Sequence, residues 1–189
     1  LEFRRVLFRS SADKVPELMG SITELVVSPG ISLEHPWVAL AREAGARIIG
    51  DIDLFAAEVT APVVGITGSN GKSTVAALLA QMIAACGKQV GLGGNIGIPA
   101  LDIVDDNVDC YVLELSSFQL ERSEPLHLTV ATVLNVTEDH LDRHGSLPKY
   151  HLAKHMIFRG AKAVVVNRND PLTQPLLDAP VDVVVWRPG

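Results

Sequence analysis

A glycine-rich segment contains the residues with the clearest potential for chemistry. The segment Gly65–Thr74, with the sequence GITGSNGKST, follows an apolar run and precedes an Ala/Leu-rich run. Glycines let backbone N–H groups turn toward phosphate oxygens, and the N-terminus of a helix adds its positive dipole end. Lys72 would supply a positive charge to the β- and γ-phosphates, and Ser73 a hydroxyl ligand for Mg²⁺. The segment therefore predicts a phosphate loop.

One position departs from the standard phosphate-loop pattern G-x-x-x-x-G-K-S/T. Its first glycine would fall on position 66, which is Ile, and Gly68 instead gives a shorter G-x-x-G-K-S form. The alternative is a glycine-rich turn that caps a helix and carries a solvated lysine. We favour the phosphate loop, because the loop, the lysine, the hydroxyl and the strand-to-helix context coincide.

Polar residues also end two later apolar runs. Glu114 lies at the end of the run 111–115, and His140 lies in the polar cluster after the run 128–134. Ligands of open α/β sheets bind beyond the carboxyl ends of the strands, so Lys72, Glu114 and His140 could converge on one phosphate–metal site. Mg²⁺ prefers oxygen ligands, which suits Glu114 better than His140. By pattern alone, Glu114 is equally consistent with a helix-capping or ion-paired residue.

Two further histidines have a spacing that can bind a metal. His151 and His155 are four residues apart, on one face of a predicted helix. A third ligand of obvious spacing is missing from the sequence around them. We therefore expect a solvated helix face rather than a metal site at this pair.

Short apolar runs alternate with helical patterns along the chain. Strands are expected at 25–27, 46–49, 62–67, 88–92, 109–115, 128–134, 163–167 and 181–186, and helices at 34–44, 51–58 and 73–85. The later strands are β-branched and apolar on both faces. This arrangement predicts an α/β fold with a parallel sheet covered by helices on both sides.

Composition limits the class of protein. The chain has 189 residues, of which 48% are hydrophobic and 20% charged, with a formal net charge of −6. Such a chain is too apolar to be disordered, has no run of about 18 apolar residues that could span a membrane, and is too acidic for general nucleic-acid binding by charge. We place a domain boundary near Thr60–Pro62. Residues 1–10, LEFRRVLFRS, are expected to be a cloning or fragment-boundary scar.

Four segments together resemble the Mur ligases. They are Thr67–Thr74, Gly93–Gly97 (GGNIG), Glu114–Glu121 (ELSSFQLE) and Asn135–His144 (NVTEDHLDRH). The resemblance covers the chain from about Val15 onward. It implies that residues 11–60 are part of a Rossmann-like, UDP-substrate-binding N-terminal domain. Residues 61–189 would be the N-terminal part of a central ATPase domain with a mainly parallel sheet, and the C-terminal domain of the family would be absent.

The resemblance implies an ATP- and Mg²⁺-dependent ligase. Its reaction would add D-glutamate to UDP-N-acetylmuramoyl-L-alanine through an acyl phosphate, in peptidoglycan precursor synthesis. We expect a monomer of the bacterial cytoplasm that binds neither nucleic acid nor membranes, and a fragment that is inactive alone. The alternatives are a non-catalytic phosphate-loop module and a related Mur or folylpolyglutamate-type ligase.

The resemblance also implies a role for individual residues. ATP would be bound by Gly68, Ser69, Asn70, Gly71, Lys72, Ser73 and Thr74, with Lys72, His140 and Lys154 as catalytic residues. Metal ligands would be Ser73, Glu114, His140 and, if it is carbamylated, Lys154. Ser28, Pro29 and Gly30 would lie beside the uracil ring, and Asn95 and Ser116 would contact the muramoyl-alanine part of the substrate.

Overall fold

The computed structural model describes residues 22–176 and 182–186. The scar expected at residues 1–10 lies outside these residues, as does position 181 at the start of the last expected strand. The chain forms two compact units that divide between Ile49 and Gly50. No helix in the described part of the chain is both long enough and apolar enough to cross a membrane.

The first unit is a small parallel β–α–β arrangement. Strand β1 (Glu24–Val26) is followed by helix α2 (Pro36–Glu43) and strand β2 (Arg47–Ile49). The two strands pair in parallel, with Glu24 opposite Arg47. Ala41 and Ala46 are buried here against partly buried residues of both strands. These elements confirm the strand, helix and strand expected between residues 25 and 49.

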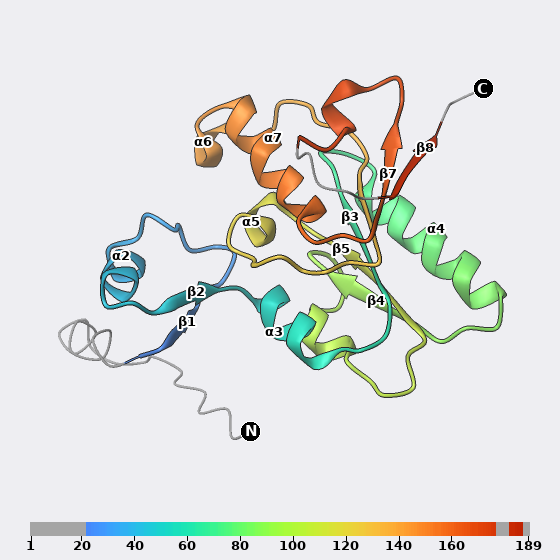
Figure 1. Ribbon diagram of the computed structural model, residues 1–189, viewed down its shortest axis with the longest axis horizontal. Coiled ribbons are helices and arrows are strands. Elements are labelled where there is room, and N and C mark those ends of the chain that lie inside the picture. The colour runs from blue at the N-terminus through green and yellow to red at the C-terminus, as the bar shows by residue number, and fades with distance from the viewer. Residues whose placement is uncertain (1–21, 177–181, 187–189) are drawn as a thin grey trace. The chain divides into compact units, whose positions relative to one another are not determined.

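The second unit contains a six-stranded sheet (Figure 1). Its strands are β3 (Val63–Thr67), β4 (Val90–Gly94), β5 (Cys110–Glu114), β6 (Val130–Val133), β7 (Ala163–Asn167) and β8 (Asp182–Trp186). Their order is β4-β5-β3-β6-β7-β8, and every pair is parallel. The prediction of a parallel α/β sheet is therefore confirmed.

Helices connect these strands. They are α3 (Asp51–Glu58), α4 (Lys72–Ala85), α5 (Ser117–Leu120), α6 (Leu141–His144) and α7 (Leu147–His155), with 3-10 turns η2 (Ala100–Ile103), η3 (Met156–Phe158) and η4 (Pro171–Thr173). The short helices α5 and α6 have too few residues to show a helical period, and the sequence did not predict them.

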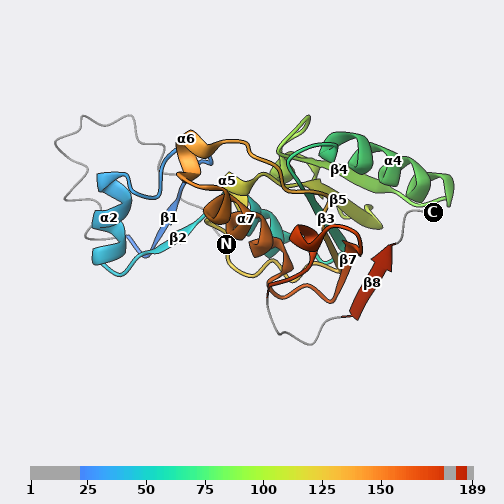
Figure 2. The same cartoon turned by 90° about the horizontal axis from the view of Figure 1, so that it is seen from above.

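Both faces of the sheet are covered, because successive residues of a strand point to opposite faces. On one face, Ile66 and Val112 pack against Ala76 of α4. On the other face, Leu113 belongs to a cluster that includes Phe55 of α3 and Tyr150 of α7. Figure 2 shows α4 and α7 on opposite sides of the strands. These two apolar layers stabilise the sheet. The polar groups lie at the ends of its strands.

The division between the units differs from the boundary expected near Thr60. Ile52 and Phe55 of α3 are buried in the core of the second unit, where the ring of Phe55 lies edge-on to that of Tyr111 with their centroids 5.1 Å apart. Because this burial removes large apolar side chains from water, residues 51–58 pack with the sheet of the second unit.

Strand β4 also ends later than the expected range 88–92, because it continues through two glycines. Gly94 pairs with Glu114 of β5 and has φ +114°, and a Cβ atom at this position would lie 2.3 Å from the carbonyl oxygen of Glu114. Only glycine allows such a close approach. It brings the next residue, Asn95, within 2.7 Å of that same oxygen, to which its backbone N–H donates.

Candidate nucleotide-binding site

The strand order brings three loops to one edge of the sheet. β3 lies between β5 and β6, so the loops at the carboxyl ends of these strands are neighbours. The hydroxyl of Thr67, at the end of β3, donates to the carbonyl of Leu115, 2.7 Å away. On the other side, the N–H of Ser69 donates to the carbonyl of Asn135 at 3.0 Å. The glycine-rich segment is thus held between the ends of both neighbours.

The glycine-rich segment forms a loop that ends in the first turn of α4. Gly71 is the N-cap residue, and its left-handed conformation (φ 80°, ψ 0°) is one that glycine adopts without strain. The N–H groups of Lys72, Ser73 and Thr74 belong to the first helical turn and have no acceptor within the helix. Together with the helix dipole, they form an end that suits a phosphate group.

Two loop amides are already occupied. The N–H of Asn70 donates to the side-chain oxygen of Asn135 at 2.9 Å, and the side-chain amide of Asn135 donates back to the carbonyl of Asn70 at 3.0 Å. The N–H of Ser69 is taken by the carbonyl of Asn135. Ser69 and Asn70 therefore hold the loop in shape, whereas the amides at the start of α4 have no acceptor within the helix.

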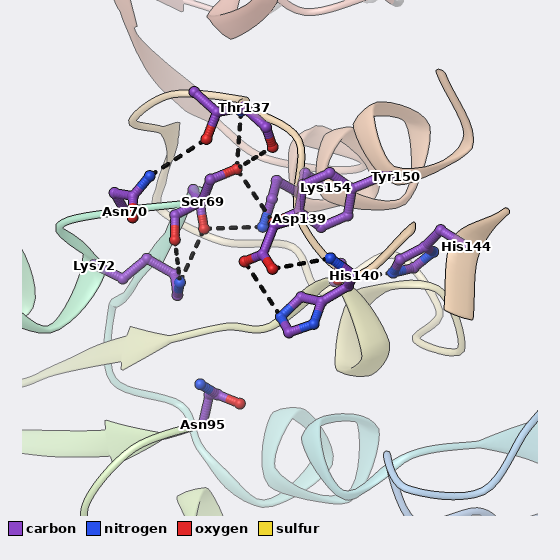
Figure 3. Close-up of polar contacts among 12 residues, drawn as sticks. Ser69, Asn70, Lys72, Asn95, Thr137, Asp139, His140, His144, Tyr150 and Lys154 are labelled. Atoms are coloured by element: carbon purple, nitrogen blue, oxygen red, sulfur yellow. Dashed lines mark hydrogen bonds and ion pairs between the residues drawn. The ribbon is translucent and has the colours of Figure 1, made fainter. Parts of the chain in front are cut away.

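Two lysines converge on one carbonyl of this loop (Figure 3). The Nζ atom of Lys72 lies 2.9 Å from the oxygen of Gly68 and 3.1 Å from that of Ser69. The Nζ atom of Lys154, from α7, lies 2.9 Å from the same oxygen of Gly68. The ammonium of Lys72 beside the first-turn amides concentrates positive charge, which favours a polyanionic ligand.

Lys154 is 2% exposed and lies in an unusual environment. Its ammonium is 4.4 Å from the centre of the Tyr150 ring, a cation–π contact. Burial, followed by the charge of Lys72, lowers the pKa of Lys154 to about 7, against the opposing charges of Asp139 and Glu114. A substantial fraction of this amine is therefore neutral near pH 7.

Glu114 joins the phosphate loop to the Asn95 loop. It is 2% exposed, and its Oε2 atom accepts a hydrogen bond from the hydroxyl of Ser73 at 2.7 Å. Its Oε1 atom accepts one from the side-chain amide of Asn95 at 3.0 Å. A hydroxyl and a carboxylate so close together are oxygen donors of the kind that Mg²⁺ prefers. The predicted pair of Ser73 and Glu114 thus fits this metal.

His140 is placed differently from Glu114. Its side chain is 49% exposed, and its Nε2 atom lies 3.5 Å from an oxygen of Asp139, whose other oxygen accepts from the backbone N–H of His140 at 2.9 Å. Within the ranges that the structure describes, no three His, Cys, Asp or Glu side chains form a group that could hold a metal. The structure thus brings Lys72 and Lys154 together on the carbonyl of Gly68, and Ser73 together with Glu114, while the described contact of the His140 ring is with Asp139.

The remaining predicted residues fall into three places. Thr74 lies in the first turn of α4, and its side chain is exposed. Ser116 is the N-cap of α5, where its hydroxyl accepts from the N–H of Gln119 at 3.1 Å. Ser28, Pro29 and Gly30 follow β1 in the first unit. For Ser116, the observed role is to begin a short helix at the end of β5.

The pair of histidines on α7 does not form a solvated face. The Nε2 atoms of both His151 and His155 lie 2.8 Å from the carbonyl oxygen of Leu172, and their ring centres are 4.1 Å apart. The expectation was wrong for His155, which is 2% exposed. A carbonyl oxygen has two lone pairs, so it can accept from both rings. Burial lowers the pKa of His155 to about 4, and the ring is neutral near pH 7.

Sequence reasoning missed three residues that shape the loop, namely Thr137, Tyr150 and Asn135. The hydroxyl of Ser69 donates to the carbonyl of Thr137 and accepts from its N–H, both at 3.0 Å, and lies 3.2 Å from the phenol oxygen of Tyr150. The side chain of Asn135 makes two hydrogen bonds with the backbone of Asn70. Asn135 and Thr137 directly follow an apolar strand, and that position was the available signal. Tyr150 carried no signal, because it is buried on a helix distant in sequence.

A phosphate loop at the carboxyl edge of a parallel sheet, with an acid on the adjacent strand, defines a class of α/β nucleotide-binding domains. Residues 66–185 match the Mur ligase middle domain. Because this match spans more than half of the chain, the protein belongs to the Mur ligase family.

Relatives within the family are similar to much of the chain. The UDP-N-acetylmuramoylalanine–D-glutamate ligase of Pseudomonas syringae pv. tomato is 58% identical over 154 residues, which are 82% of this chain and 34% of the relative. The ligase of the same name from Pseudomonas aeruginosa is 58% identical over 161 residues, 85% of this chain and 36% of the relative. The chain therefore spans about a third of the length of these curated relatives.

The fold is also found in solved structures. The MurF ligase from Thermotoga maritima, in complex with ADP, superposes with a TM-score of 0.55 at 20% sequence identity. The similarity covers 89% of this chain and 49% of that protein. At this level of identity, the likeness supports the α/β fold of the chain.

Proposed function

We propose that this chain is the nucleotide-binding part of an ATP-dependent ligase that adds D-glutamate to UDP-N-acetylmuramoyl-L-alanine. The observation that carries the proposal is the convergence of Lys72, Lys154 and the first turn of α4 beside the Ser73–Glu114 pair. The similarity to D-glutamate ligases supports the choice of substrates. The enzyme would act as a monomer in the bacterial cytoplasm and bind neither nucleic acid nor membranes.

Different residues of the site would bind different anionic groups of the substrates. Lys72 and the amides at the start of α4 would bind the phosphates of ATP, which fixes the γ-phosphate for attack by a carboxylate. Ser73 and Glu114 would hold Mg²⁺, which neutralises phosphate charge when it is bound. Asn95, through its bond to Glu114, would place its loop next to the reacting end of the substrate. His140 would approach from the end of β6, oriented by Asp139.

We further propose that Lys154 is carbamylated. A neutral amine reacts with CO₂ to form a carbamate anion and releases one proton; counted from the ammonium form, two protons are released and a cation is replaced by an anion. The pKa of about 7 and the near-complete burial of Lys154 favour this reaction, because they leave neutral amine available. In ¹³C NMR spectra recorded with ¹³C-bicarbonate, we expect a carbamate carbon signal that disappears in Lys154→Arg. Identical spectra of the two proteins would contradict the proposal.

A segment exchange tests the proposed activity. The matching segment of the Pseudomonas aeruginosa ligase is replaced by this chain from residue 22 onward, and phosphate release is measured with ATP, UDP-N-acetylmuramoyl-L-alanine and Mg²⁺. We expect release that requires D-glutamate and is abolished by Lys72→Ala. A chimera that folds and binds ATP but releases no phosphate would favour the alternative, a non-catalytic nucleotide-binding module. D-Alanine and L-glutamate serve as control acceptors.

A further inference from the structure

His144, the last residue of α6, is a buried histidine that takes no part in the chemistry proposed above. It is 8% exposed, although α6 has only four residues and begins after the exposed His140. Its Nε2 atom lies 3.0 Å from the hydroxyl oxygen of Ser117, the first residue of α5. Its Nδ1 atom lies 3.7 Å from a carboxylate oxygen of Glu121, which directly follows α5. Because both ring nitrogens have polar neighbours, the orientation of this ring is fixed and α6 is tied to α5.

The ring of His144 packs against the ring of Phe118. The two rings are stacked, with 3° between their planes and 5.1 Å between their centroids. The guanidinium of Arg143 lies 5.3 Å from the centroid of the same Phe118 ring. Stacking and cation–π contacts favour one orientation of an aromatic side chain. Two residues of α6 therefore hold the ring of Phe118, which is only partly buried.

Phe118 in turn packs against His140, and their ring centroids are 5.1 Å apart. His140 has φ 50°, a left-handed conformation that is uncommon for residues other than glycine and persists only where the surroundings hold it. Its carbonyl accepts from the N–H of His144 at 3.0 Å, and Asp139 contacts both its backbone and its ring (Figure 3). The exposed ring of His140 is therefore placed against a neighbouring ring that His144 holds.

We propose that His144 is a positioning residue, which keeps the ring of His140 in place through Phe118. The inference rests on the proposed function, in which His140 takes part in the reaction. A displacement of about 1 Å at a reacting group can lower a rate about 100-fold, so the loss of His144 should lower kcat rather than the affinity for ATP. Because the contact with Phe118 is made by a flat ring, phenylalanine should replace His144 and an aliphatic residue should not.

NOE spectroscopy on the 189-residue chain measures the contact between the rings of His140 and Phe118, and it requires neither substrate nor metal. The unsubstituted chain should show NOEs between the ring protons of these two residues. His144→Leu should lose these NOEs, because leucine offers no flat surface to Phe118. His144→Phe should keep them, although it leaves the hydroxyl of Ser117 without this partner. NOEs that persist in His144→Leu would overturn the inference.

The matched control is His127→Asn. His127 is an exposed histidine that also has φ 50°, but it precedes β6, whereas His140 follows that strand. Asparagine tolerates this conformation, so the NOEs of His140 should be unchanged. If circular dichroism shows that His144→Leu does not fold, His144→Met replaces it, because the flexible side chain of methionine fills irregular spaces without providing a ring. NOEs of full intensity in His144→Met would then overturn the inference.

The kinetic consequence is measured in the chimera with the Pseudomonas aeruginosa ligase. His144→Leu should lower kcat at least about tenfold and leave the KM for ATP within about twofold, and His144→Phe should restore most of the rate. The kcat is expressed per ATP-binding site, so that a loss of folded enzyme does not lower it. Equal kcat values with and without His144→Leu would overturn the inference. An inactive unsubstituted chimera would instead contradict the proposed function, and the NOE comparison would still test the position of His140.

Discussion

The two ends of strand β3 have opposite characters. At the carboxyl end, the oxygen of Gly68 accepts from the Nζ atoms of Lys72 and Lys154, and Ser69 hydrogen-bonds with Thr137 in both directions. At the other end, Phe55 and Leu128 are buried in the apolar core of the second unit. The polar end holds groups ready for a ligand, and the apolar end provides burial that stabilises the sheet. Substitutions at the two ends should therefore change different measurable properties.

The largest effect is expected at the apolar end. Phe55→Ala removes a buried ring from the contact with Tyr111 and should lower the free energy of unfolding by about 3–5 kcal/mol. Urea denaturation followed by circular dichroism measures this change. Leu78→Ala on the exposed face of α4 is the control, with an expected change within about 0.5 kcal/mol. Equal losses of unfolding free energy in Phe55→Ala and Leu78→Ala would contradict the stabilising role of the apolar end of β3.

Lys72→Ala tests the polar end. The affinity for ATP and Mg²⁺ should fall about 100-fold in isothermal titration calorimetry, which corresponds to about 2.7 kcal/mol. The free energy of unfolding should change little, because Lys72 is only half-buried and lies beside a like charge. Lys149→Ala serves as the matched lysine control. An ATP affinity that survives the loss of Lys72 would show that the loop does not hold the phosphates.

A dependence of stability on pH is expected from His155. The pKa of about 4 in the folded protein lies below the ordinary 6.5, so between pH 4 and 6.5 the unfolded chain binds more protons. Stability should therefore fall as the pH decreases from 6.5 to 4, by about 1–3 kcal/mol from this residue. Denaturation at several pH values should show a weaker dependence in His155→Gln. If that variant keeps the full dependence, other groups cause it.

The smallest effect is expected in the pKa of Lys154, which the charge of Lys72 influences. In NMR titrations of ¹³C-labelled lysine in CO₂-free buffer, where Lys154 is a free amine, Lys154 should titrate near pH 7, far below the ordinary 10.5. The charge of Lys72 contributes to this lowering, so Lys72→Met should raise the pKa of Lys154. Lys88→Met on an exposed part of the chain should leave it unchanged. A pKa of Lys154 that does not change in Lys72→Met would show that the charge of Lys72 does not lower it.

The site could be predicted where its signals are local in sequence. Gly68, Lys72 and Ser73 lie in one strand–loop–helix segment, and Glu114 ends an apolar strand, so their placement at one edge followed from the pattern. Asn135 and Lys154 contact the loop from 65 and 86 residues away. For Lys154 only a resemblance indicated a role, because an isolated lysine on a helix carries no information about burial.

By itself, the sequence determined the alternation of strands and helices, the parallel sheet and the segment proposed to bind an anion, because apolar periodicity and glycine conformations act over a few residues. Only the tertiary structure decided that Ser69 and Asn70 use their amides on Asn135, that Lys154 is buried beside Lys72, and that the half-exposed His140 ring faces Asp139. These contacts depend on which strands are neighbours and on how deeply each helix buries its side chains. Both follow from the packing of the whole unit and cannot be read from any single segment.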